Sequence, residues 1–198
     1  MWCRPSTSPT SITCSSAVKT RAVQICFSLI CLVLGAAVQE MLPSFGGAKA
    51  PVLALVALYA AFREDDVSPR PGAPRVHSQG WIAIALMAGA LEDALNCVPS
   101  GCCTLFTLLA STAARFARPF VHGLPPAATG LAAAMVSAPL HELWLAGWGA
   151  LGPETPLLVR FFASALPAAA AGALLFTILP SLEHHIGYVT PGTEGRLG

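Results

Sequence analysis

Long apolar stretches separated by short polar segments dominate the pattern of the chain. A helix needs roughly 20 apolar residues to cross the hydrocarbon core of a bilayer. Two of the six apolar stretches exceed that length and the other four are shorter. We predict a helix in each, at residues 22–38, 51–62, 81–98, 102–117, 127–151 and 157–182. The second is the shortest, so we expect it either to extend a little at both ends or to lie in a thinned or protein-covered part of the bilayer.

The polar segments predict the parts of the chain outside the bilayer. Residues 1–21 are rich in Ser and Thr and end in two basic residues, which is typical of a disordered tail. Residues 63–80 form a polar loop with three prolines, and residues 183–198 form a polar, Gly-rich C-terminal tail. The stretch 22–38 also resembles a signal peptide, but we predict that it stays as an uncleaved helix because the charge distribution requires it.

Composition agrees with a membrane protein. The chain has 198 residues, of which 55% are hydrophobic and 11% are charged, whereas a soluble domain carries about 25% charged residues. Such a chain cannot cover a water-facing surface, so we expect membrane lipid to be its main solvent. The formal net charge of +1 provides no field for binding nucleic acid. The predicted fold class is an all-α integral membrane protein, a six-helix transmembrane bundle.

The distribution of Lys and Arg predicts how this bundle is oriented. If the six stretches alternate across the bilayer, nine of the eleven basic residues fall on the side that holds both termini: Arg4, Lys19, Arg21, Arg63, Arg70, Arg75, Arg115, Arg118 and Arg196. The other side holds only Lys49 and Arg160. Because cytoplasmic loops carry the excess of Lys and Arg, we predict that both termini are cytoplasmic and that the protein lies in an inner (cytoplasmic) membrane.

Five ionisable residues fall inside the predicted spans: Glu92, Asp93, His141, Glu142 and Arg160. At about 1.5 Å of rise per residue, all five belong to the outer half of the bundle. A buried charge in lipid needs a partner. We therefore expect Arg160 to pair with Glu142 or Asp93, and we expect His141 to lie nearby.

Helical spacing predicts which faces of two helices turn inward. On the third helix, one face collects the positions Gly89, Glu92, Asp93 and Asn96. On the sixth, a ridge of small residues follows the charged position, in the order Arg160, Ser164, Ala168 and Gly172. Small residues allow helix backbones to approach closely in membranes, so we expect this ridge to face a neighbouring helix.

Four roles are open for the five ionisable residues. The favoured one is a structural ion pair that locks the third, fifth and sixth helices; the others are a proton or ion path, a polar docking site for another membrane subunit, and a hydrolytic site. Adjacent residues on a helix point about 100° apart. Neither Glu92-Asp93 nor His141-Glu142 therefore aims two groups at one atom, and the chain has no HExxH, GxSxG or phosphate-binding glycine loop. We predict no catalytic residues.

The seven cysteines do not form paired CxxC motifs, so no zinc site is predicted. Cys97, Cys102 and Cys103 flank a turn on the predicted outer side, where a disulfide could form. Free thiols in tight helix packing are the favoured alternative. The pair His184-His185 is more typical of solvated residues than of a metal site. We predict no cofactor.

Short motifs recur in order through residues 36–118. Gln39 and Pro43 close the first helix, and the second ends in the run Tyr59-Ala60-Ala61-Phe62-Arg63. Gly89-Ala90-Leu91-Glu92-Asp93 and the turn Pro99-Ser100-Gly101 follow, and the fourth helix ends in Ala113-Ala114-Arg115. This series resembles MreD, the rod shape-determining membrane protein family of bacteria. The residues matched in its central motif are Gly89, Asp93, Pro99 and Gly101.

The chain also departs from the family pattern. Ala50-Pro51-Val52 stands where the family often has an acidic residue, the loop after Arg63 is longer and more acidic, and Glu92 is an additional charge. The last two helices match the family only in length and hydrophobicity.

The resemblance implies a non-enzymatic subunit of the lateral cell-wall elongation complex. Its implied role is to scaffold an MreC-like protein and the peptidoglycan synthase, which is the RodA glycosyltransferase with its penicillin-binding partner, next to the MreB filament. The family's architecture is similar to that of the substrate-binding S-component subunits of ECF-type (energy-coupling-factor) transporters. A small-solute-binding subunit of such a transporter is therefore the alternative function.

Overall fold

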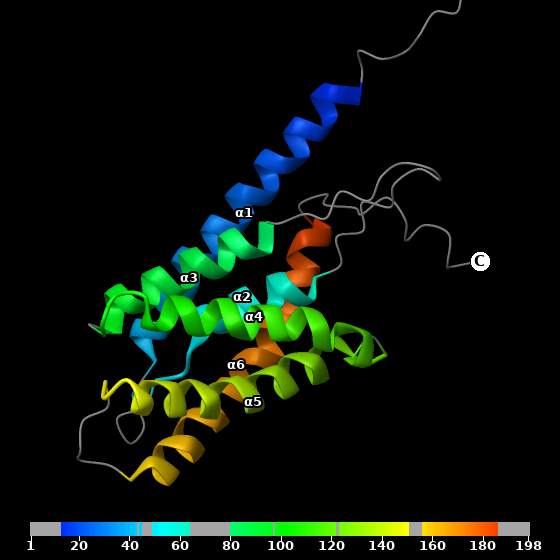
Figure 1. Ribbon diagram of the computed structural model, residues 1–198. Helices are drawn as coiled ribbons and strands as arrows, with labels where there is room; N and C mark the ends of the chain where they lie inside the picture. The colour runs from blue at the N-terminus through cyan, green and yellow to red at the C-terminus, as the bar shows by residue number, and fades with distance from the viewer. Residues whose placement is uncertain are drawn as a thin grey trace, which may run out of the picture.

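The computed structural model is all-helical in the residues that it describes, which are 13–42, 44, 49–63, 80–96, 98–121, 123–150 and 156–185. Figure 1 shows the six helices: α1 (Thr13–Met41), α2 (Val52–Phe62), α3 (Gly80–Asn96), α4 (Cys102–Val121), α5 (Pro126–Gly147) and α6 (Leu157–His185). A helix is present at each of the six predicted positions. Within the ranges given above, the chain forms no strand.

α1, α4 and α6 all extend several residues beyond their predicted bounds. α1 begins at Thr13, so the last nine residues of the predicted disordered tail are helical. They contain neither Gly nor Pro, and nothing in them interrupts the backbone hydrogen-bond ladder. α6 continues through Pro167 and Pro180 to His185. The remainder of the two predicted tails, residues 1–12 and 186–198, lies outside the described residues.

The fifth helix is shorter than predicted. α5 ends at Gly147, and Gly149 follows with φ +67°. This left-handed conformation suits glycine and ends the helical path. The fourth helix is instead longer than predicted, because α4 runs through Pro119 to Val121.

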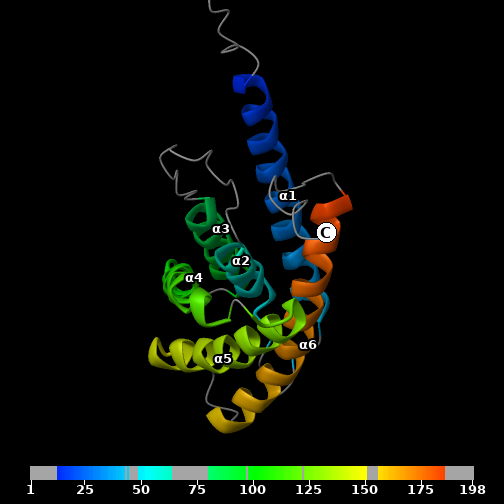
Figure 2. The ribbon, with the colours of Figure 1, turned by 90° about the vertical axis from the view of Figure 1, so that its right-hand side faces the viewer.

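α2 lies at the centre of the molecule and contacts all the other described helices. Figures 1 and 2 show it enclosed by its neighbours. Eight of its eleven residues are buried: Val52, Leu53, Ala54, Leu55, Val56, Ala57, Leu58 and Ala61. A helix that is apolar all round is one that is buried all round. The predicted extension at both ends is wrong, because α2 stays within residues 51–62. Of the alternatives, cover by protein is the one that the burial supports.

Close backbone contacts at glycines join neighbouring helices. A Cβ atom on Gly130 of α5 would collide with the backbone of Gly172 on α6, and the converse also holds. A Cβ atom on Gly89 of α3 would likewise collide with the backbone of Thr104 on α4. The predicted small-residue ridge of the sixth helix is buried along its length, and its glycine packs directly against α5.

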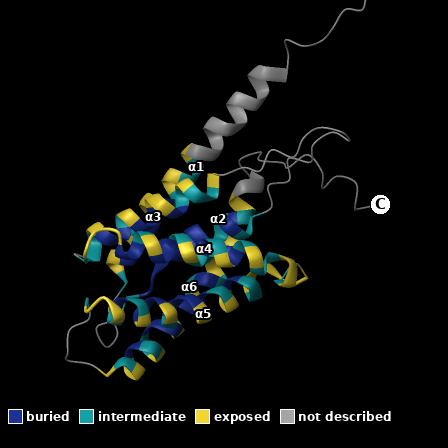
Figure 3. Ribbon diagram, in the orientation of Figure 1, coloured by how far each residue is buried: buried dark blue, intermediate teal, exposed yellow. Residues whose placement is uncertain are grey.

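The outer surface of the helices is rich in large apolar side chains. Exposed examples occur on α1, α3, α4, α5 and α6, and in α6 they include Leu158, Phe162, Leu166 and Leu174. Figure 3 shows exposed positions alternating with buried ones around these helices. By length and composition, the segment Leu157–Leu182 is the one described helix that is long and apolar enough to cross a membrane.

Candidate functional site

Asp93 holds the connection between α3 and α4. Its Oδ1 accepts a hydrogen bond from the backbone N–H of Cys103 at 2.6 Å. Its Oδ2 accepts from the N–H of Gly101 at 2.8 Å and from the hydroxyl of Thr104 at 2.7 Å. The first N–H groups of a helix have no partner within the helix, and a negative charge there is stabilised by the helix dipole. Asp93 therefore caps α4 from the preceding helix.

The other residues of this motif serve the same helix connection. Gly101 has φ +95°, a conformation that favours glycine, and Cys102 donates its N–H to the carbonyl of Pro99 at 3.1 Å. Gly89 provides the space in which the start of α4 packs against α3. The four residues matched to the family motif thus build one helical hairpin.

Glu142 and Arg160 form an ion pair between α5 and α6. The distance from Arg160 Nη1 to Glu142 Oε2 is 3.8 Å, and both side chains are largely buried. This confirms the expected pairing of Arg160 with Glu142. The other expected partner, Asp93, is instead occupied with the N-terminus of α4, because that helix begins only a short turn after α3 ends.

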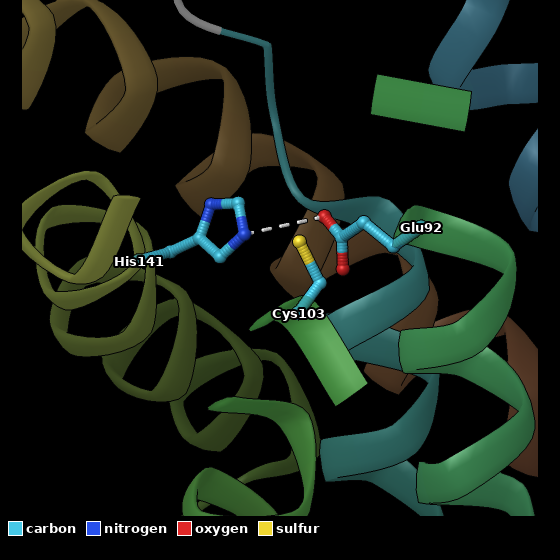
Figure 4. Close-up of side chains that lie close together, drawn as sticks. All are labelled: Glu92, Cys103 and His141. Carbon is cyan, nitrogen blue, oxygen red and sulfur yellow. Dashed lines mark ion pairs between the residues drawn. The ribbon is translucent and has the colours of Figure 1, made fainter. Parts of the chain in front are cut away.

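Glu92 and His141 face each other from α3 and α5, as Figure 4 shows. His141 Nε2 lies 3.5 Å from Glu92 Oε1, and the two residues are 4% and 0% exposed. Among the described residues, neither carboxylate oxygen and neither ring nitrogen meets hydrogen-bond geometry with any partner. The His141 ring packs edge-on against Phe106, with centroids 5.0 Å apart, and Gln39 approaches Glu92 from α1.

Cys103 completes this group from the first turn of α4. Its sulfur, a Glu92 oxygen and a His141 nitrogen all lie within 4.8 Å of one another. In Figure 4 the sulfur points toward the line that joins the other two groups. Cys102 and Cys103 are both buried free thiols, which agrees with the favoured alternative for them. Cys97, the third cysteine of the possible disulfide, lies outside the described residues.

The two pairs of adjacent ionisable residues each divide between separate partners. Glu92 faces His141 while Asp93 caps α4, and Glu142 reaches Arg160 on α6. The expectation that neither pair aims two groups at one atom is confirmed. The arrangement favours holding helices together over acid–base chemistry on a shared substrate atom, because each carboxylate is committed to a different helix.

Sequence reasoning missed two members of the cluster, Cys103 and Gln39. Both are fully buried, yet neither carries a formal charge that would have set it apart in an apolar stretch. Gln39 lies at the end of α1, where its Oε1 accepts the N–H of Leu53 at 3.2 Å. Gln39 could have been identified from its position in the motif that resembles the family, whereas no spacing pattern in the sequence indicates Cys103.

An apolar groove of about 770 Å³ lies between α4 and α5. Small side chains such as Ala113 and Ala133 form its walls, and Leu58 and Phe62 of α2 contribute to its lining. The side chains of Phe106 and Trp144 also line the groove, and Phe106 stands against His141. None of the five predicted ionisable residues lines it.

No protein-family model matches the chain, and searches of curated proteins and of solved structures also find no match.

Proposed function

We propose that the protein is a multi-pass inner-membrane protein with six spans and both termini in the cytoplasm. Two observations support this arrangement. The described helices expose many large apolar side chains that water would solvate poorly and lipid would solvate well. Strict alternation of six spans also collects nine of the eleven basic residues on one side. α2 is about 16 Å long, because it has 11 residues. It is therefore too short to cross the bilayer alone, and the neighbouring helices must cover its ends.

Within that membrane setting, we propose that the protein is a non-enzymatic, MreD-like subunit of the cell-wall elongation complex. One observation carries the proposal: the motif residues that resemble the family form hydrogen bonds to the ends of neighbouring helices. Asp93 and Gly101 form the start of α4. Gln39 binds the first turn of the buried α2.

A third motif acts on the other end of α2. Arg115, from the motif that closes the fourth helix, donates to the carbonyls of Ala61 and Arg63 at 3.4 Å each. Those two carbonyls belong to the motif that closes the second helix. A helix end needs partners for its last carbonyls. Motifs that are separate in the sequence therefore meet at both ends of the same central helix, which is what a shared family architecture would require.

The proposed role is a scaffold for an MreC-like protein and for the RodA glycosyltransferase with its penicillin-binding partner, next to the MreB filament. Depletion of the protein in its host tests this role directly. We expect rod-shaped cells to widen and round, and lateral wall insertion to fall. Unchanged cell shape and wall insertion after verified depletion would reject the proposal.

Co-purification supplies a second, independent test. A tagged copy extracted in mild detergent should carry MreC-like and RodA-like proteins. Asp93→Ala should lose them if the α3–α4 hairpin supports the docking surface, and the matched control Asn96→Ala, one turn further along α3, should retain them. The control leaves the cap of α4 intact because Asn96 is not among its hydrogen-bond donors or acceptors.

The alternative, a solute-binding subunit of an ECF-type transporter, has less support. Such a subunit needs a polar pocket, and none of the ionisable cluster lines the groove between α4 and α5. The purified protein should therefore show no thermal shift with water-soluble vitamins. A saturable shift with any of them would favour the transporter.

A further inference from the structure

Glu92, Cys103 and His141 bring three metal-ligating side chains from three helices to one buried point. The three residues are 0%, 0% and 4% exposed, and their ligand atoms lie within 4.8 Å of one another. Figure 4 shows the three groups converging. We propose that this cluster binds a structural Zn²⁺ ion that joins α3, α4 and α5.

The distances favour a shared ion over a direct hydrogen bond. His141 Nε2 and Glu92 Oε1 are 3.5 Å apart, and they do not meet hydrogen-bond geometry. Two ligands of one tetrahedral zinc ion, at bond lengths of about 2.1 Å, lie roughly 3.4 Å from each other. The separation that is long for a hydrogen bond is therefore the separation that two zinc ligands adopt.

Unpartnered polar atoms at this point also indicate an ion. Both Glu92 oxygens and both His141 nitrogens fail strict hydrogen-bond geometry with every described residue, although the side chain of Gln39 approaches the carboxylate. Burial of such groups without partners is unfavourable. A Zn²⁺ ion would take one Glu92 oxygen, one His141 nitrogen and the Cys103 sulfur as three of its four ligands, which leaves one position for a further ligand such as water.

The charges balance in the bound state. Zinc binding replaces the thiol proton of Cys103, which leaves to solvent, and takes Glu92 as a carboxylate and His141 as a neutral imidazole. The two negative ligands and the divalent ion then sum to zero. A neutral complex is what the apolar interior of a helical bundle accepts most readily. Imidazole, thiolate and carboxylate together also suit zinc better than the harder cations Mg²⁺ and Ca²⁺.

The neighbouring backbone holds the ligands in place. The N–H of Cys103 is bound by Asp93 at 2.6 Å, and its carbonyl accepts the hydroxyl of Thr107 at 2.7 Å. Trp144 donates its indole N–H to the carbonyl of Cys102 at 2.9 Å. This bond ties α5 to the start of α4 one turn from His141, so two of the three ligand-bearing helices are fixed relative to each other.

Metal analysis of the full-length protein tests the proposal. The protein is purified in detergent through a tag without histidine, and its metal content is measured by mass spectrometry. We expect about one zinc per chain in the wild type. A well-folded wild-type preparation without zinc or another transition metal above the background of the buffer would overturn the proposal.

Cobalt substitution identifies the ligands. Cells grown with Co²⁺ in place of zinc should yield protein with the near-ultraviolet charge-transfer band of a cobalt–thiolate bond. Cys103→Ser should lose this band, while Cys102→Ser should keep it, since the control replaces a neighbouring buried cysteine outside the cluster. A band that survives Cys103→Ser, or that is absent from metal-loaded wild type, would overturn the assignment. The wild-type measurement decides the matter even if a variant does not accumulate. It is also independent of cell shape, so it can fail without the proposed function failing.

Discussion

At the scale of single residues, the buried ion pair between Glu142 and Arg160 offers the most direct test of the packing. Both partners are largely removed from solvent at the contact between α5 and α6. Removal of one partner of such a pair leaves the other charge buried, at a cost of roughly 3–5 kcal/mol. We expect Arg160→Leu to lower the melting temperature of the purified protein and its level in cells.

A second variant separates charge from packing in that experiment. The double variant Glu142→Gln with Arg160→Leu removes both charges, so it should recover much of the stability that Arg160→Leu loses. If the single and double variants are equally unstable, the loss comes from the volume of the arginine side chain. If Arg160→Leu is as stable as the wild type, the pair contributes nothing.

Asp93 gives a prediction about the cap of α4. Asp93→Ala removes the acceptor for three backbone N–H groups and one hydroxyl. Loss of a cap costs typically about 1 kcal/mol, and more where the donors are buried. Asp93→Ala should therefore melt well below the wild type. Asp93→Asn, which keeps one oxygen acceptor and the side-chain shape, should fall between the two. Equal melting temperatures for all three would contradict the capping role.

Residue-level reasoning from the sequence succeeded where a charge stood alone in an apolar stretch. The pairing of Arg160 with Glu142 followed from the rule that a charge in lipid needs a partner. The same rule did not predict that Asp93 would cap α4. A cation and the free N–H groups of a helix start both compete for a nearby carboxylate, and the rule considers only the cation. The position of Cys103 in the cluster could not be predicted, because its contacts involve three helices and the spacing of residues within one helix does not indicate such contacts.

At the scale of helices, the contact between α5 and α6 depends on glycine. Gly130 and Gly172 bring the two backbones so close that a Cβ atom on either would meet the other. We expect Gly130→Ala to destabilise the protein by about 1–3 kcal/mol, because the extra methyl forces the helices apart. The thermal melting of the purified protein measures this effect.

Gly147 is the matched control in the same helix. A Cβ atom there would meet nothing within 4 Å. Gly147→Ala should therefore leave stability unchanged or raise it slightly, since alanine has the higher helix propensity. A similar loss at both positions would show that α5 is sensitive to any substitution of glycine.

The existence of the six helices could be read from the sequence, whereas several of their ends could not. Apolar length set the six positions, whereas the brevity of residues 51–62 left open whether that helix extends, lies in thinned bilayer or is covered by protein. α1 starts nine residues before the predicted position, because a polar segment rich in Ser and Thr resembles a tail but is helical here. Polarity alone does not stop a helix that has no Gly or Pro in its path, as residues 13–21 demonstrate.

At the scale of the whole molecule, the proposed topology makes a prediction about accessibility. Ser44, Ser100 and Gly123 are exposed positions between helices. Alternation of six spans puts Ser44 and Ser100 outside the cytoplasmic membrane and Gly123 in the cytoplasm. A cysteine introduced at each position reports its side through reaction with a membrane-impermeant maleimide.

We expect Ser44→Cys and Ser100→Cys to be labelled in intact spheroplasts, and Gly123→Cys only after lysis. Each substitution is made in a variant whose native cysteines are replaced by serine, because Cys97 lies close to Ser100 in the sequence and Cys26 is exposed on α1. Labelling of Ser44→Cys only after lysis would mean that α1 does not cross the membrane. Labelling of Gly123→Cys without lysis would break the alternation at α4, and the nine basic residues would then no longer share a side.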